Sequence, residues 1–221
     1  GMGGSVLTVR VLRALGYIGG GALTIHPLDS TDPAALNAIV RDLAAAHGLA
    51  LPPDAAPLTE PETLRALLGD VALVAVALGM TSEEPITHLT WFTELLQRSE
   101  LSPAEHILVM TLPGSYLDIF AQEHHAPSRP LQLDGGSGTG GRMSAPATRV
   151  FLLPAALYLT GLSAESGQLR AVLQSAWDAY DLELATTHLA QHPFAQLADL
   201  LLQTIGLGFQ VSGLDAVCGF Q

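Results

Sequence analysis

The sequence contains no lysine. All nine of its basic residues are arginines, against 21 acidic residues, which gives a formal net charge of −12. Nucleic acids and anionic membranes bind clustered positive charge, so this balance argues against either as the main partner. The absence of lysine also excludes Schiff-base chemistry and any phosphate site that depends on a lysine. A phosphate group can still bind locally, through backbone amides, hydroxyls and one or two arginines.

Cysteine and long apolar runs are also scarce. The single cysteine, Cys218, cannot form an internal disulfide, as expected in a reducing compartment. No apolar run approaches the roughly twenty residues that cross a membrane. The start around Met2 lacks the basic and apolar regions of a signal peptide, so we expect a cytoplasmic protein. The hydrophobic share of 48% indicates a globular chain.

Apolar runs typical of buried strands alternate with amphipathic helical patterns. This order predicts an α/β fold whose parallel sheet is covered on both faces. After Ala145 the pattern becomes mostly helical. The predicted strands are residues 22–28, 71–78, 106–112 and 129–134.

Several helix boundaries can be predicted from capping residues. Asp32 is placed as an N-cap before Pro33, with Gly48 as the stop. Two further pairs have the spacing of a capping box, Thr59 with Glu62 and Thr81 with Glu84. A last helix is expected from about Ser115 to His124.

Three loops leave the carboxyl ends of predicted strands, at residues 79–84, 112–115 and 134–144. Ligands of parallel sheets bind at this edge, so we expect the loops to line one crevice. The third loop contains the glycine-dense stretch "GGSGTGGRMSAP" at 135–146. Such a loop is either a tight structural junction or an anion-binding turn, and its residues alone leave both possibilities open.

The amino end, "GMGGSVL", is a second glycine turn before an apolar helix, and no strand precedes it in the sequence given. We therefore expect the sheet edge or apolar face left open there to be covered by a second copy, giving a homodimer.

These segments and their order resemble the sugar-isomerase (SIS) domain of the phosphoglucose isomerase family. The resemblance is carried by "GMGGSVL", "DSTDPAAL", "ILVMTLPGSYLDIFAQE" and "GGRMSAPATRVFLLPAAL". It implies a three-layer α/β/α sandwich over residues 1–160, with 161–221 as a helical extension packing on it. The chain resembles a truncated or divergent member of the family.

The resemblance also implies a function and a site. The family interconverts glucose 6-phosphate and fructose 6-phosphate without a cofactor, in glycolysis and gluconeogenesis, through an enediolate that an arginine stabilises. It assigns Arg142 as the catalytic residue. It assigns substrate binding to Gly4, Ser5, Thr81, Ser82, Gly140, Gly141 and Ser144, and it implies no metal.

Two departures from the family pattern favour a second hypothesis. The family's SKSGTT phosphate loop is "ALGMTS" here, at residues 77–82, and retains only the hydroxyls of Thr81 and Ser82. The glutamate base lies in a later domain of the family, and no residue of this chain matches it. The alternative is a non-catalytic module that binds sugar phosphates or is purely structural.

Other candidates have ordinary explanations. His124 and His125 are adjacent, point in different directions on a helix, and are read as a solvated helix end rather than metal ligands. Glu83 and Glu84 offer a general base, but negative charge is common at a helix start. The aromatic residues Trp91, Phe92 and Trp177 are expected in the core.

Overall fold

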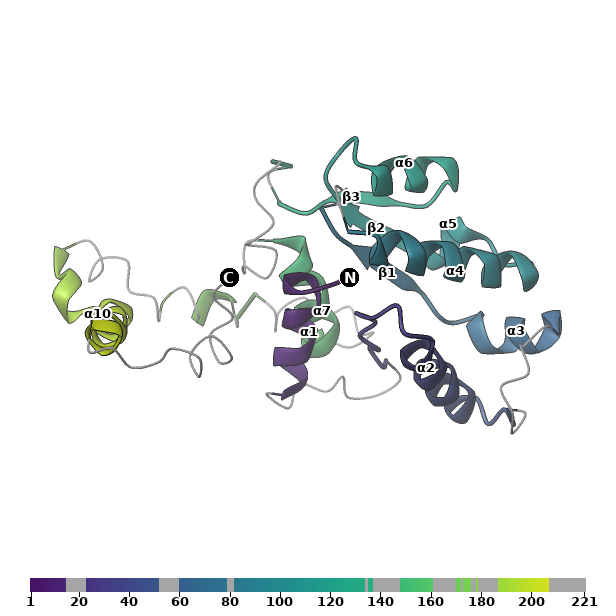
Figure 1. Ribbon diagram of the computed structural model, residues 1–221, viewed down its shortest axis with the longest axis horizontal. Coiled ribbons are helices and arrows are strands. Elements are labelled where there is room, and N and C mark those ends of the chain that lie inside the picture. Colours follow the sequence, from purple (N-terminus) through teal and green to yellow (C-terminus); the bar gives the residue numbers. More distant parts are fainter. Residues whose placement is uncertain are drawn as a thin grey trace. The chain divides into compact units, whose positions relative to one another are not determined.

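The computed structural model divides the chain into two compact units, Gly1–Glu165 and Ser166–Gln221, each described here by itself. The structure describes residues 1–14, 23–51, 60–78, 82–133, 135–136, 148–160, 170–171, 173–175, 178 and 187–206. The first unit contains every strand of this described part (Figure 1).

A parallel sheet of three strands forms the centre of the first unit. Its strands are β1 (Leu73–Val76), β2 (Ile107–Thr111) and β3 (Ser128–Pro130), in the order β1-β2-β3. Val76 lies opposite Met110, and Val109 lies opposite Ser128. The prediction of an α/β fold with a parallel sheet is therefore confirmed.

Helices connect and flank these strands. Helix α4 (Glu84–Arg98) and the short α5 (Pro103–His106) lie between β1 and β2, and α6 (Tyr116–Glu123) lies between β2 and β3. The other helices of this unit are α1 (Gly4–Ala14), α2 (Pro33–Ala46), α3 (Pro61–Leu68) and α7 (Arg149–Thr160).

Each face of the sheet packs against its own set of helices. On one face Ala75 and Val109 are buried against Leu89 of α4 and Leu117 of α6. On the opposite face Val76 and Met110 are buried against Val150 of α7, which packs in turn against α1. Successive strand residues point to opposite faces, so uninterrupted apolar runs are needed where both faces are covered.

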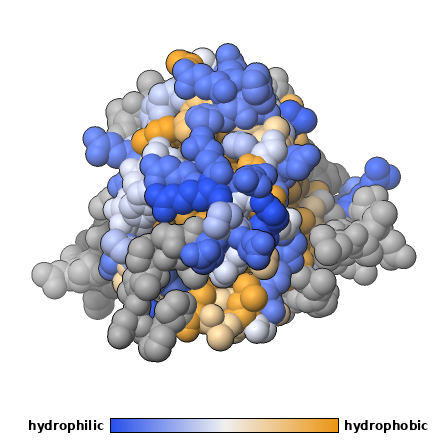
Figure 2. All heavy atoms as spheres, turned by 90° about the vertical axis from the view of Figure 1, so that its right-hand side faces the viewer, coloured by the Kyte–Doolittle hydropathy of each residue, from blue (hydrophilic) through white to orange (hydrophobic). Residues whose placement is uncertain are grey.

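Helices α2 and α3 form a further apolar cluster beside α4. Ala44, Leu67 and Leu68 are its buried members, and Phe92 of α4 packs against both this cluster and the sheet. Phe92 is partly buried and packs against both clusters, so its expected place in the core is confirmed only in part. The outer side of the helices on the right of Figure 1 is mostly hydrophilic, with scattered apolar patches (Figure 2).

The predicted ends of α2 and α6 are confirmed. The Asp32 carboxylate accepts a hydrogen bond from the Ala34 amide, Pro33 opens α2, and Gly48 follows the helix with a φ of 66° that favours glycine. Ser115 caps α6, its hydroxyl oxygen accepting from the Asp118 amide at 3.3 Å.

The predicted starts of two other helices, α3 and α4, were wrong. Helix α4 begins at Glu84, and α3 begins at Pro61, so Glu84 and Glu62 are too early in their helices to close the capping boxes. Each helix has a proline, Pro61 or Pro85, within its first two positions, where the ring's fixed φ favours helix initiation. Thr59 and Thr81 lie outside the described residues.

The prediction of a strand at 22–28 is also wrong for the residues of this range that the structure describes. Residues 23–30 form no strand. Pro27 lacks the amide hydrogen that a ladder position needs, and this segment lines a cavity beside β1 instead.

The described part of the second unit is helical where it is continuous. A 3₁₀ turn at Leu189–Gln191 precedes helix α10 (Pro193–Gly206). The packing of residues 161–221 on the first domain remains a prediction. Within the residues that the structure describes, no helix has the length and apolar character needed to cross a bilayer.

We expect Leu117→Ala to lower the free energy of unfolding by about 2–5 kcal/mol, because its side chain is fully buried between α6 and the sheet. Ile119→Ala is the matched control on the same helix, since Ile119 is 50% exposed, and it should change stability by about 0.5 kcal/mol or less. Urea denaturation measures both. Equal losses would contradict the packing of α6.

Candidate functional site

The start of α1 lies at the carboxyl end of β1. A Cβ atom on Gly1 would clash with the Ser5 hydroxyl and come within 2.7 Å of the carbonyl oxygen of Val76, the last residue of β1. The first turn of α1 is therefore placed at the edge where ligands of parallel sheets bind.

Ser5 and Gly4, both predicted to bind substrate, lie in this first turn. Gly4 is exposed and opens the helix. Ser5 is 7% exposed, and its hydroxyl donates to the Met2 carbonyl at 2.7 Å. A hydroxyl that donates still has lone pairs to accept, so Ser5 could accept a hydrogen bond from a ligand hydroxyl.

Ser82, predicted to bind phosphate, lies just before α4. It is exposed, and its carbonyl accepts a hydrogen bond from the hydroxyl of Tyr116, the first residue of α6. Burial raises the pKa of Tyr116, and the nearby Glu84 and Glu83 carboxylates raise it further. The starts of α4 and α6 are thus joined at the same edge.

The starts of α1 and α4 are also close enough to interact electrostatically. The pKa of the Gly1 amino group is lowered by burial, an effect opposed by the carboxylates of Asp29 and Glu84. Asp29 forms an ion pair with Arg10 at 2.5 Å. The described side chains at this edge thus bring two carboxylates near the start of α1.

The loop after β2 is held together by its own side chains. The Thr111 hydroxyl lies 2.9 Å from that of Ser115 and donates to the Leu78 carbonyl at 3.2 Å. This contact connects the end of β2 to the segment that follows β1. The convergence of the three predicted loops stays a prediction, because residues 79–81, 134 and 137–144 lie outside the described part.

Asp118 fixes the same loop from the first turn of α6. Its carboxylate accepts hydrogen bonds from the Gly114 amide at 2.9 Å, from the Ser128 hydroxyl at 2.8 Å and from Gln122 at 3.2 Å. The first two of these bonds are the main reasons that the pKa of Asp118 is lowered. The sequence analysis missed this residue, although Ser115 and Asp118 have capping-box spacing.

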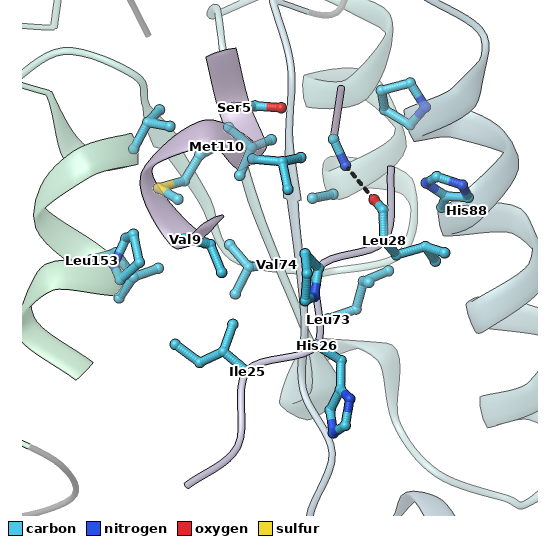
Figure 3. Close-up of a pocket in the computed structure, with 18 of the residues that line it drawn as sticks. Ser5, Val9, Ile25, His26, Leu28, Leu73, Val74, His88, Met110 and Leu153 are labelled. Carbon is cyan, nitrogen blue, oxygen red and sulfur yellow. Dashed lines mark hydrogen bonds between the residues drawn. The ribbon is translucent and has the colours of Figure 1, made fainter. Parts of the chain in front are cut away.

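A cavity of about 130 Å³ lies beside β1 and below the start of α1. Its walls come from α1, the segment 25–28, β1, α4 and α7, and they are mainly apolar. Figure 3 shows Ser5 and Val9 from α1, with Leu153 and His88 on opposite sides.

His88 is the buried titratable side chain of this cavity wall. It is 4% exposed, and its Nε2 lies 3.0 Å from the Ser30 carbonyl, which can only accept, so Nε2 carries the proton. Burial is the main cause of its lowered pKa, partly opposed by the hydrogen bond to Ser30. The ring therefore holds the segment before α2 against α4.

The remaining predicted site residues lie outside the described residues. These are Arg142, Thr81, Gly140, Gly141 and Ser144. The described arginine closest to them in sequence, Arg149, donates to the carbonyls of Pro130, Gln132 and Leu133, and so anchors the end of β3.

The minor candidates are placed as follows. His124 stacks on Phe120 with ring centroids 4.2 Å apart, and the exposed His125 adopts a positive φ of 55° after α6. Among the described residues, no group of three or more His, Cys, Asp or Glu side chains could hold a metal ion. Trp91 is half-buried, whereas Trp177 and Cys218 lie outside the described part.

Fold and site geometry define a parallel α/β domain with helix starts gathered at one edge. No family model and no curated protein matches the chain. Among solved structures, it is similar to the crystal structure of a hypothetical protein, TT0462, from Thermus thermophilus, with a TM-score of 0.63 and 23% sequence identity. The match covers 92% of this chain but 40% of that one, so the chain spans well under half of its length. This likeness bears on the fold alone.

We expect Asp118→Ala to lower the free energy of unfolding at pH 7 by about 1 kcal/mol, the low end for a carboxylate that accepts hydrogen bonds near solvent. Because folding lowers its pKa, the carboxylate stabilises the native state above the unfolded pKa, and this contribution is lost as the pH falls through the folded pKa. The variant should thus differ least from the parent in acid. Glu123→Gln, at an exposed position of the same helix, is the control in urea titrations. An equal effect of the two substitutions would show that the hydrogen bonds accepted by Asp118 do not stabilise the fold.

The burial of His88 predicts a second loss of stability in acid, caused here by a buried base and not by a carboxylate. Its folded pKa is lowered, so the unfolded chain binds the proton first and stability falls as the pH drops below about 6.5. His88→Gln should flatten this slope, and exposed His125→Gln should not. Thermal unfolding between pH 8 and pH 5 measures it, and an unchanged slope in His88→Gln would contradict the burial of a neutral ring.

Proposed function

We propose that the first unit is an SIS-like, three-layer α/β/α domain that binds a phosphorylated sugar at the carboxyl edge of its sheet. One observation carries the proposal: α1 and α4 both begin at this edge, with Ser5 in the first turn of one and Ser82 just before the other. A helix start carries a partial positive charge, which suits a phosphate. In α1 the amides of Ser5 and Val6 already donate to the carbonyls of Met2 and Gly3, so this charge is the main attraction that α1 supplies.

The negative charge at this edge gives one arginine, Arg142, the main role in binding a phosphate. Asp29 and Glu84 carry negative charge near the start of α1, and Arg10 is already paired with Asp29. A dianionic phosphate needs a counter-charge there, and in this proposal the guanidinium of Arg142 supplies it. The same guanidinium would face the sugar carbons and stabilise an enediolate, as in the phosphoglucose isomerase family.

Binding without turnover is the second candidate. Glu83 is the N-cap of α4 and Glu84 its first residue, where their charge stabilises the helix, so neither is assigned as the catalytic base. The loop at 77–82 also has fewer hydroxyls than the family's phosphate loop. A non-catalytic sugar-phosphate module accounts for both facts.

We expect the chain to bind fructose 6-phosphate and Arg142→Ala to weaken binding by about tenfold or more, as for loss of a charge-assisted pair. Arg98→Ala, in the last turn of α4, is the matched control and should bind like the parent. Isothermal titration calorimetry measures all three proteins. Equal binding by Arg142→Ala and the parent, or no binding by either, would overturn the proposal.

A coupled assay for conversion of fructose 6-phosphate separates the two candidates. Turnover that disappears in Arg142→Ala supports an isomerase. Binding with no turnover above background supports the non-catalytic module. Both candidates place the proposed homodimer in the cytoplasm, and light scattering that finds a lone subunit at micromolar concentration would reject the dimer.

A further inference from the structure

The start of α4 is held by a side chain from another helix. Tyr116, the first residue of α6, donates a hydrogen bond from its hydroxyl to the carbonyl of Ser82, which precedes the N-cap residue Glu83. Tyr116 and Ser82 are 34 positions apart in the sequence. Through this contact α6 controls the direction of the backbone that enters α4.

Tyr116 is itself fixed in place. Its ring packs against the buried cluster that contains Leu89 of α4 and Leu117 of α6. Its backbone belongs to the first turn of α6, where the hydroxyl of Ser115 lies 2.9 Å from that of Thr111 at the end of β2. A ring held in this way presents its hydroxyl at one place, so little further freedom is lost when the hydroxyl bonds to the Ser82 carbonyl.

This hydrogen bond determines where the amide of Glu83 points. Ser82 and Glu83 share one planar peptide group, in which the carbonyl oxygen and the amide hydrogen lie on opposite sides. The backbone of Glu83 is already helical, with a φ of −81° and a ψ of −26°. The amide of a helical residue points toward the start of its helix. The Glu83 amide therefore points out of α4 at the carboxyl edge, while Tyr116 holds the carbonyl on the other side.

Other amides at the gathered helix starts are already used or missing. In α1 the amides of Ser5 and Val6 donate to carbonyls of the preceding residues. In α4 the second position is Pro85, which has no amide hydrogen. The first turn of α4 thus has one donor fewer than a regular helix start. The direction of the Glu83 amide therefore has more influence on a bound anion.

The groups around Tyr116 keep its hydroxyl a donor. Burial raises the pKa of Tyr116, and the carboxylates of Glu84 and Glu83 raise it further, so the hydroxyl keeps its proton at neutral pH. The same carboxylates repel an anion, and amide dipoles must offset this repulsion where a phosphate binds. A peptide whose carbonyl accepts a hydrogen bond is polarised, which strengthens its amide as a donor. Tyr116 can thus act on a ligand through the peptide group that it holds.

We propose that Tyr116 is a positioning residue for phosphate, which aims the Glu83 amide at the phosphate group by holding the Ser82 carbonyl. The inference rests on the proposed function, because it needs a phosphate at this edge. It goes further in assigning the phosphate to the Ser82–Glu83 peptide at the start of α4. It also specifies the part of the ligand that is affected: Tyr116 changes the affinity for the phosphate group, with or without an attached sugar.

Tyr116→Phe in the full chain tests this, because it removes the hydroxyl and keeps the ring. We expect it to weaken the binding of fructose 6-phosphate and of inorganic phosphate by the same factor, about three- to tenfold, as for loss of one hydrogen bond. Tyr158→Phe is the matched control, because Tyr158 is a buried tyrosine near the end of α7, away from the helix start. It should change either affinity by about twofold or less. Calorimetry measures the sugar phosphate, and NMR titration measures the weaker inorganic phosphate.

Amide resonances give a readout that a loss of stability alone would not move. Saturation of the parent chain with fructose 6-phosphate should shift the amides of both Glu83 and Gly4. In Tyr116→Phe at saturation, the shift of Glu83 should be much smaller, whereas that of Gly4, in α1, should be retained. If Tyr116→Phe fails to fold, the parent chain still tests the inference, because its Glu83 amide must move.

Three results would overturn the inference and leave the proposed function standing. Equal binding of fructose 6-phosphate by the parent and Tyr116→Phe shows that the hydroxyl does not position the site. A loss of affinity for the sugar phosphate but not for inorganic phosphate shows that Tyr116 acts on the sugar. A Glu83 amide that stays unmoved in the saturated parent shows that the phosphate lies elsewhere. No binding by the parent overturns the proposed function and this inference with it.

Discussion

The parallel ladder between β1 and β2 is the constraint on which the rest of the first unit depends. Ala75 and Val109 lie in register across it and are buried against α4 and α6, while Val76 and Met110 face α7. Because all strands run in one direction, the helices that follow them must start at the same edge. The position of that edge, and the fact that the helices start from it, are therefore consequences of hydrophobic burial.

Two different surfaces result from this single sheet. The carboxyl edge is polar, but the hydroxyls of Thr111 and Ser115 and the carboxylate of Asp118 bond to their own loop, so they act as structural supports. What the edge offers a ligand is chiefly the helix starts. The cavity beside β1 is mainly apolar instead, which does not suit a phosphate.

The sequence predicted best the features that local chemistry determines. Uninterrupted apolar runs located β1 and β2, and Asp32 with Pro33 located the start of α2. Prediction failed where neighbours decide: residues 22–28 are as apolar as a strand, yet a strand needs a ladder partner, and residues 23–30 form no strand. At the site, Ser5 and Ser82 were correctly expected at helix starts. The burial of Ser5 and the three hydrogen bonds of Asp118 were not predicted, because they depend on contacts between distant residues that sequence spacing does not reveal.

The central claim is that the gathered helix starts form the binding surface for a phosphorylated sugar. Backbone amide resonances followed by NMR during titration with fructose 6-phosphate test it most directly. The account predicts saturable shifts concentrated at Gly4, Ser5 and Ser82, with little change at the amino ends of the strands. Shifts centred on the opposite edge of the sheet, or no saturable shifts at millimolar ligand, would contradict it.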